Sequence, residues 1–266
     1  MRPQSLLSLV LLVACARGAV LHAQEEAALA KKSQNPLANM ISLPLQNNTT
    51  FNVGSADGTV NVFNIQPVFP MPVGNAINVI HRAILPVTYQ GEIVQGIGSE
   101  FGLGDLNYTA FFTPRNAGSV IWGIGPSFLV PTATDDRLGA GKWGVGGSVV
   151  VLTMPGKWVL GALVQNTWSV AGDDARSDVN LFFSQYFVNY NLGTGLYLSS
   201  APIITANWEA PSGQQWTVPF GGGVGKVFRL GSMPVDGQVQ AFVNAIKPDA
   251  AGNWSLRLQF KMLFPK

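Results

Sequence analysis

Large apolar residues alternate with polar ones along most of the chain after residue 40, and the last segment shows the pattern most clearly. Residues 254–264 read WSLRLQFKMLF, in which nearly every second residue is large and apolar. Because successive side chains of a β-strand point to opposite faces, this segment predicts a strand with Arg257, Gln259 and Lys261 on its polar face. Such a strand belongs either to a soluble sheet that buries its apolar face or to a barrel that exposes it to lipid.

The same period of two recurs in segments of about 10 to 13 residues that are separated by turn signals. The predicted strands are 41–51, 59–70, 77–89, 103–113, 120–132, 143–153, 158–169, 179–190, 196–208, 216–229, 236–246 and 254–264. A tilted strand of about ten residues climbs roughly 23 Å, close to the height of the apolar band of a membrane barrel. We therefore predict that residues 41–266 form an all-β, antiparallel transmembrane outer-membrane β-barrel of about 12 strands. Pairing of the first and last strands would close it.

The connections between these strands alternate in length. Short turns are predicted at 72–76, 114–118, 155–157, 191–195 and 230–234, and longer polar loops at 90–102, 131–142, 171–178, 209–215 and 247–253. The connection 54–58 is short although it lies on the long-loop side. This asymmetry is typical of outer-membrane barrels and places both chain ends on the short-turn, periplasmic side.

Tryptophan and proline give opposing signals. All seven tryptophans fall near predicted strand ends, as expected for rings at a membrane interface. Six prolines, however, fall inside predicted strands: Pro44, Pro67, Pro86, Pro126, Pro202 and Pro219. Proline removes a ladder hydrogen bond, so these positions predict bulges, rim irregularities or a partly open barrel. They are also the one feature that favours a soluble secreted β-sandwich.

Composition and the N-terminus indicate the compartment. Charged residues make up only 11% of the chain, against roughly 25% in soluble domains. No basic stripe exists, so we expect no binding to nucleic acid. Residues 1–23 read as a secretory signal peptide, with cleavage after Ala23 or after Ala16, and 24–40 as a flexible or locally helical periplasmic leader. The alternative is a lipoprotein whose acylated residue is Cys15, the single cysteine.

Several stretches together resemble the putative outer-membrane proteins of the MetA-pathway of phenol degradation family. They are FNIQPVFP (63–70), FGLGDLNYTAFFTPR (101–115), GPSFLVPTATDDRLGAGKWGVG (125–146), GALVQNTWSVAGD (161–173), FVNYNLGTGLYLSSAPIITANWEA (187–210) and WTVPFGGGVGKVFRLG (216–231). The resemblance runs from about residue 40 to the C-terminus. It implies a barrel in the outer membrane of a Gram-negative bacterium that passes small hydrophobic compounds, and it supplies no site residues.

The sequence contains three possible chemical sites. His81 is the one histidine outside the signal peptide and predicts an outward-facing interfacial side chain rather than the base of a lipid hydrolase. GGGVGKVF (221–228) departs from a phosphate loop at Phe220 and Val227, so its glycines predict a bend or a packing surface for a lumen side chain. The acidic loops around Asp135 and Asp173 fit solvated turns better than a cation site. We predict no enzyme activity, no cofactor and no metal.

The expected functional residues are those that the alternation directs into the lumen. They are Arg82, Gln165, Phe183, Gln185, Phe187, Asn189, Gln240, Phe242, Arg257, Gln259 and Lys261, together with Gln238 and Asn244. A barrel of about twelve strands has a narrow bore, part of which the leader is expected to plug. These residues favour a conduit for small, hydrophobic, weakly polar or anionic aromatic solutes. A structural or adhesive barrel with a filled lumen is the alternative. Expected partners are outer-membrane lipid, lipopolysaccharide, and the barrel-assembly machinery through strand 254–264.

Overall fold

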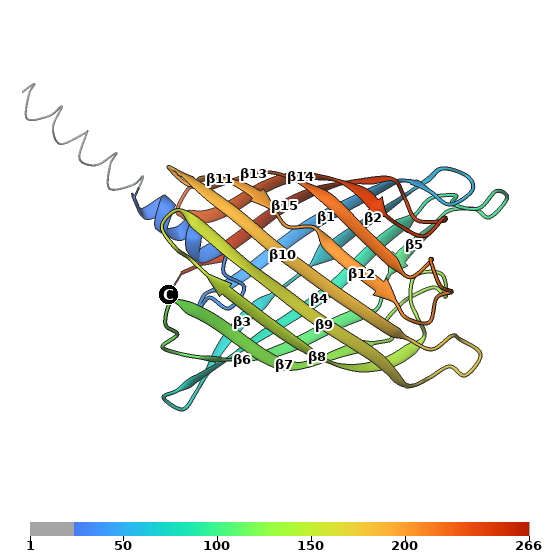
Figure 1. Ribbon diagram of the computed structural model, residues 1–266, viewed down its shortest axis with the longest axis horizontal. Helices are drawn as coiled ribbons and strands as arrows, with labels where there is room; N and C mark the ends of the chain where they lie inside the picture. Colours follow the sequence, from blue (N-terminus) through green and yellow to red (C-terminus); the bar gives the residue numbers. More distant parts are fainter. Residues whose placement is uncertain (1–23, 266) are drawn as a thin grey trace, which may run out of the picture.

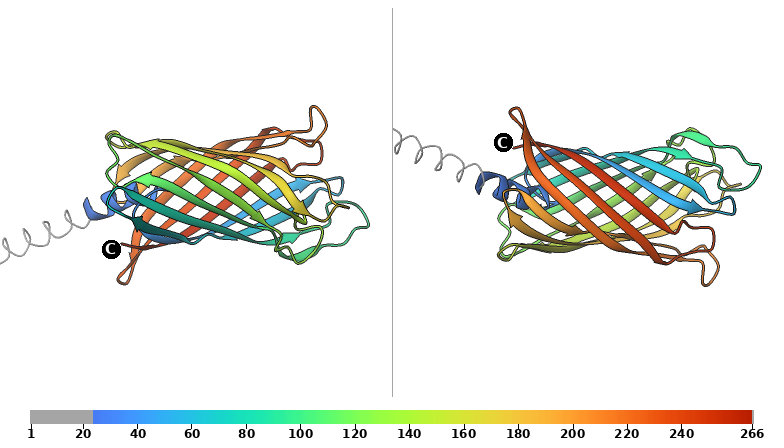
Figure 2. Two further views of the ribbon diagram at one scale, coloured as in Figure 1. Left: turned by 90° about the horizontal axis from the view of Figure 1, so that it is seen from below. Right: turned by 90° about the horizontal axis from the view of Figure 1, so that it is seen from above.

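A closed antiparallel β-barrel forms the body of the protein (Figures 1 and 2). The computed structural model describes residues 24–265. Its fifteen strand segments are β1 (Ile41–Val53), β2 (Gly58–Ile65), β3 (Val68–Val73), β4 (Ile77–Gln90), β5 (Glu100–Leu103), β6 (Leu106–Pro114), β7 (Val120–Val130), β8 (Lys142–Thr153), β9 (Trp158–Gly172), β10 (Asn180–Gly193), β11 (Leu196–Ser200), β12 (Ile203–Asn207), β13 (Trp216–Leu230), β14 (Met233–Ile246) and β15 (Trp254–Phe264). The pairs β2–β3, β5–β6 and β11–β12 are interrupted halves of single strands, which gives twelve barrel strands and confirms the predicted fold class.

The first and last strands close the barrel. β1 pairs with β15 without a register shift from Ile41↔Phe264 to Phe51↔Trp254. The pairing of β9 with β10, from Asn180↔Trp168 to Tyr190↔Trp158, completes the ring of strands. Closure removes the two sheet edges, so the backbone hydrogen bonds of the wall are satisfied within the barrel.

The alternation of short and long connections is present in the structure. The turns after β3, β6, β8, β10 and β13 lie at one end of the barrel, where the leader and the end of β15 also lie (Figure 1). The loops 91–99, 131–141, 173–179, 208–215 and 247–253 lie at the other end. We refer to these ends as the short-turn rim and the long-loop rim.

The outer face of the wall is apolar. Phe220, Val170 and Val243 are 73%, 64% and 62% exposed, although they are large hydrophobic residues. All seven tryptophans are also at least one-third exposed on this surface: Trp122, Trp143, Trp158, Trp168, Trp208, Trp216 and Trp254. A sandwich would bury such residues between its sheets. The apolar face therefore points outward, and the soluble β-sandwich alternative is wrong.

The six prolines coincide with interruptions of the sheet, as their position predicted. Pro67 and Pro202 occupy the breaks between β2 and β3 and between β11 and β12, and Pro219 lies at a register shift between β13 and β14. Pro44 and Pro86 lie opposite breaks in the neighbouring strand, and their carbonyls accept hydrogen bonds from the N–H groups of Gln66 and Gly104, both at 2.9 Å. At Pro126 the ladder between β6 and β7 lapses between Thr109↔Ser127 and Phe112↔Ile124. The barrel nevertheless remains closed.

The leader enters the barrel at the short-turn rim (Figure 2). Residues 24–33 form a helix, and the chain then turns until β1 begins at Ile41. Leu37, which is 5% exposed, packs in a cluster with residues of five strands: Ile80, Phe111, Val150, Leu152, Val159, Leu163 and Phe187. Hydrophobic burial therefore holds the leader against one side of the lumen.

Candidate functional site: a cavity between the leader and the barrel wall

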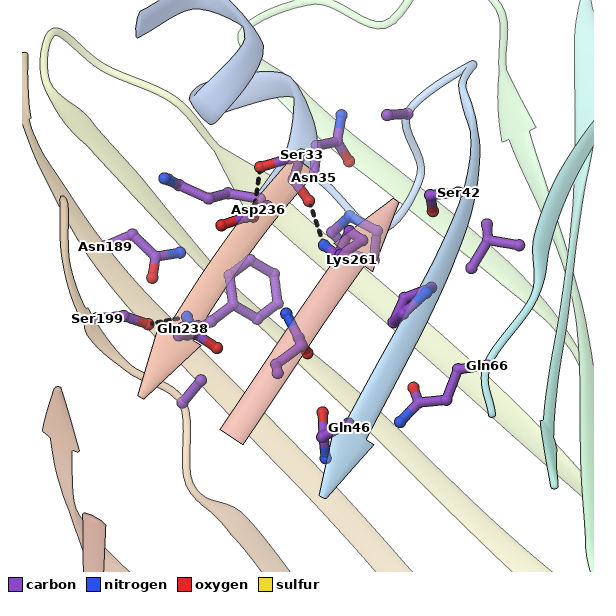
Figure 3. Close-up of a pocket in the computed structure, with 18 of the residues that line it drawn as sticks. Ser33, Asn35, Ser42, Gln46, Gln66, Asn189, Ser199, Asp236, Gln238 and Lys261 are labelled. Carbon is purple, nitrogen blue, oxygen red and sulfur yellow. Dashed lines mark hydrogen bonds between the residues drawn. The ribbon is translucent and has the colours of Figure 1, made fainter. Parts of the chain in front are cut away.

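A cavity of about 160 Å³ lies inside the barrel, between the leader and the inner wall. Figure 3 shows side chains from the leader, β1, β10, β11, β14 and β15 converging on it. Leu163 and Phe187, from the cluster that holds Leu37, contribute apolar surface to the cavity. Arg82, Arg257 and Lys261 contribute positive charge to the same lining. The cavity is therefore amphipathic, because apolar and cationic side chains line one space.

Hydrogen bonds with three strands, β10, β14 and β15, hold the leader beside the cavity. The Ser33 hydroxyl donates to Asp236 Oδ2 at 2.7 Å, and the ammonium group of Lys261 donates to the carbonyl of Ser33 at 2.7 Å (Figure 3). Gln34 and Asn191 exchange side-chain amide hydrogen bonds at 3.1 and 3.2 Å. These bonds are shielded from water, where an unmade bond costs about 1–3 kcal/mol. They complement the apolar anchor at Leu37.

Tyr197 supplies a second donor to Asp236. Its hydroxyl lies 2.6 Å from Asp236 Oδ1, and both residues are 1% exposed. The ring of Tyr197 lies against the bare backbone of Gly225, where an added Cβ would come within 2.2 Å of Tyr197 Cζ. Gly225 therefore makes room for the ring, which agrees with the packing role predicted for the glycines of 221–228.

Neutral acceptors surround Arg257. Its guanidinium donates to Asn48 Oδ1 at 2.9 Å, to the Ala201 carbonyl at 2.7 Å and to Gln240 Oε1 at 3.3 Å. The ring of Phe242 lies 4.9 Å from its Cζ, at cation–π distance. Ala201 can accept because Pro202 interrupts the strand there. The proline break thus provides one of the groups that hold this cation.

Arg82 and Lys261 make fewer hydrogen bonds. The guanidinium of Arg82 donates to Gln66 Oε1 at 3.0 Å, and Gln66 reaches it from the break between β2 and β3. Lys261 interacts electrostatically with both Asp236 and Arg82. Within residues 24–265, no carboxylate lies within 4 Å of Arg82, Arg257 or Lys261 as an ion-pair partner. The side chains lining the cavity carry three positive charges and one negative charge, a formal net charge of +2.

Each of the eleven residues predicted for the lumen has a defined position. Seven line the cavity: Arg82, Gln185, Phe187, Asn189, Arg257, Gln259 and Lys261. The other four do not line the cavity, but each contacts an inward-facing neighbour. Gln165 accepts a hydrogen bond from Ser148, Phe183 packs on the Leu37 cluster, Gln240 donates to Ser199, and Phe242 lies against Arg257. Gln238 also lines the cavity, and Asn244 bonds the Gly252 carbonyl near the long-loop rim. That a solute passes along these residues stays a prediction.

The sequence prediction omitted Asp236, Tyr197, Gln66 and Ser33. Asp236 precedes Gln238 by two residues, so the same alternation that selected Gln238 would have found it. Tyr197 lies on the inner face of its strand in the same way. Gln66 and Ser33 carry no such signal, because one lies in a strand break and the other in the leader.

The remaining candidates, His81 and the acidic loops, do not line the cavity. His81 Nδ1 lies 2.6 Å from the hydroxyl of Tyr108, and the neighbouring Arg82 faces the cavity, so His81 points outward as predicted. In the long-loop rim, Arg137 pairs with Glu100 and Asp135, and Arg176 pairs with Asp136. The Arg137 backbone N–H donates to Asp135 and lowers the pKa of that carboxyl.

Within residues 24–265, no group of three or more His, Cys, Asp or Glu side chains comes together to hold a metal ion. No helix in this part of the chain is long and apolar enough to cross a bilayer. The predicted signal peptide, Cys15 and both cleavage positions lie outside the described residues.

Comparison with solved structures gives one clear relationship. A COG4313 outer membrane channel from Pseudomonas putida F1 superposes with a TM-score of 0.66 and 18% identity, covering 85% of this chain and 94% of that one. The two chains share a fold. Outer membrane phospholipase A from Escherichia coli matches with a TM-score of only 0.39 and 11% identity, over 86% of this chain and 93% of that one. No family model and no curated protein matches the chain, so the resemblance to the MetA-pathway family stays a prediction.

Proposed function

We propose that this protein is a channel of the bacterial outer membrane that passes small hydrophobic or aromatic solutes by diffusion. The observation that carries the proposal is the amphipathic cavity, which lies inside a closed barrel whose outer face is apolar. The shared fold with an outer membrane channel supports it. Diffusion down a gradient needs neither a nucleotide nor a covalent intermediate, and the inner wall offers contact with both rings and polar groups.

The membrane partners follow from the same geometry. The exposed apolar residues and the tryptophans at both rims suit contact with lipid tails and with the membrane interface. The long-loop rim would face lipopolysaccharide, and β15 presents the alternating terminal strand through which the barrel-assembly machinery would recognise the chain. Export by the signal peptide would place the short-turn rim in the periplasm.

Planar-bilayer recordings of the purified protein test the proposal. Discrete conductance steps are expected for a conduit, and their absence across a range of voltages would contradict it. The second candidate, a structural or adhesive barrel with a filled lumen, is favoured by the leader, which is anchored by Leu37 on one side and by Asp236 and Lys261 on the other. Recordings of a variant that lacks residues 24–36 distinguish a removable plug from a solid interior.

We also propose that the protein is not an enzyme. A lipid hydrolase would need His81 beside a nucleophile, and its hydrogen-bond partner is the phenol of Tyr108. The variant His81→Ala should leave the turnover of phospholipid and lipopolysaccharide unchanged in cells. Loss of such turnover in that variant would restore the hydrolase alternative.

A further inference from the structure

The cavity combines an apolar side with two cations that retain free hydrogen-bond donors. Arg82 has five guanidinium N–H donors and uses one in the hydrogen bond to Gln66. Lys261 has three donors and uses one for the carbonyl of Ser33. The two side chains are near enough to interact electrostatically. Both line the same cavity.

The charges that face this pair do not neutralise it. Asp236 is the carboxylate that lines the cavity, and its two oxygens accept hydrogen bonds from Ser33 and Tyr197. Arg257 adds a third positive charge and is held by uncharged acceptors and by the ring of Phe242. Three buried cations with one counter-charge leave positive charge uncompensated, so an entering anion would gain favourable electrostatic interactions and hydrogen bonds there.

The volume of the cavity and its apolar side chains restrict which anion can bind there. A dry cavity of about 150 Å³ in another protein accepts benzene, and this cavity has a volume of about 160 Å³. Leu163 and the ring of Phe187 line the cavity together with the cations. A single aromatic ring with one carboxylate suits both kinds of side chain, whereas a neutral ring leaves the net positive charge uncompensated.

We propose that Arg82 and Lys261 form a binding site for the carboxylate of a small aromatic acid, whose ring contacts Phe187 and Leu163. The transport role of this site rests on the proposed channel function, but binding itself does not. Arg82 offers a planar fork that matches both carboxylate oxygens, while Lys261 supplies a point charge. The site would slow and select monoanionic aromatic solutes among those that enter the barrel.

Fluorine NMR titrations of the purified full-length protein in a neutral detergent test the proposal. The probes are 4-fluorobenzoate and 4-fluorobenzamide, which have similar size but differ in charge. Wild-type protein should bind 4-fluorobenzoate saturably and at least tenfold more tightly than the amide. Arg82→Gln should remove most of this difference, because a charge-assisted pair becomes a neutral contact. Arg82→Lys should retain part of it.

Two controls make the outcomes decisive. Arg115→Gln removes the same charge from an exposed turn at the short-turn rim and should leave both affinities unchanged. If Arg82→Gln fails to fold, the comparison of the two probes on wild-type protein still decides the matter. Equal affinities for the acid and the amide, or a preference that survives Arg82→Gln in folded protein, would overturn the carboxylate site. If the protein conducts ions but binds the acid and the amide equally well, the carboxylate site is rejected and the channel function stands. If the protein binds 4-fluorobenzoate saturably but shows no conductance, the channel function is rejected and the carboxylate site stands.

Discussion

Replacing Leu37 with alanine should release the leader from the barrel. The side chain is 5% exposed, and its methyl groups would come within 3.0 and 3.1 Å of a Cβ added at Gly123. The neighbours of Leu37 belong to a closed hydrogen-bonded wall that has little freedom to collapse into the space left behind. Truncation of a buried leucine in such a setting costs about 3 kcal/mol, within the usual range of about 2–5.

This cost falls mainly on the docking of the leader, because the wall has its own hydrogen-bond ladders. A loss of about 3 kcal/mol raises the population of undocked leader roughly a hundredfold. Trypsin reports that population, since the bond after Lys32 lies in the helix 24–33 and must leave helical structure to be cut. Cleavage should yield a barrel fragment that begins at Ser33, detectable by mass spectrometry.

A matched variant separates the leader from the barrel. Leu181→Ala removes the same atoms from a residue that is 42% exposed on the outer face, and it should leave the cleavage rate near that of wild type. The barrel itself should remain folded in both variants, as shown by its migration on gels without heating. Equal cleavage rates for Leu37→Ala and Leu181→Ala would refute the view that this side chain anchors the leader.

Three further predictions concern the inner wall and the outer face. Gly225→Ala should lower the free energy of unfolding by about 1–3 kcal/mol in urea titrations, because the added methyl group would collide with Tyr197. The control Gly147→Ala has open space around its Cβ and should have little effect. Tyr197→Phe should cost about 1–3 kcal/mol in the same titrations by removing one donor from a buried carboxylate; an unchanged midpoint would contradict this. Val149→Arg, at an outward position in the middle of β8, should lower the free energy of unfolding in lipid vesicles by about 2–4 kcal/mol. Val170→Arg, near the long-loop rim, should lower it by only about 0–1 kcal/mol. The reverse order would contradict the assignment of these positions to the lipid-facing surface.

The strands could be predicted because each carries its own signal. Alternation fixes the two faces of a segment, and turn residues mark its ends, so the twelve strands and their inward residues follow from local sequence. The sequence predicted that the strands would be interrupted at proline, but not which new contacts the interruptions would allow. Pro202 predicts a missing backbone hydrogen bond. The sequence does not reveal that the carbonyl of Ala201 accepts a hydrogen bond from Arg257, more than fifty residues away.

The position of the leader could not be predicted from its sequence. Its Ala-rich residues 24–33 are compatible with the helix that they form. Its position depends on contacts between Leu37 and five different strands and on the bond from Ser33 to Asp236. These are long-range contacts that no pattern within residues 24–40 encodes, so only the folded barrel defines where the leader lies and which part of the lumen it leaves open.

The way in which the lumen cations are stabilised bears on the solute selectivity of the proposed channel. Carboxylates placed beside Arg82 and Arg257 would have satisfied both side chains and made the cavity neutral. The protein instead uses the amide of Gln66, the carbonyl of Ala201 and the side chain of Asn48, which accept hydrogen bonds without cancelling charge. Two of these acceptors lie at breaks in the sheet that proline maintains. Because the wall around them has a low dielectric constant, the remaining positive potential would act with little screening on any solute inside the barrel. If the protein is the proposed channel, the breaks would influence which solutes the cavity favours, although Pro67 and Pro202 do not themselves line it.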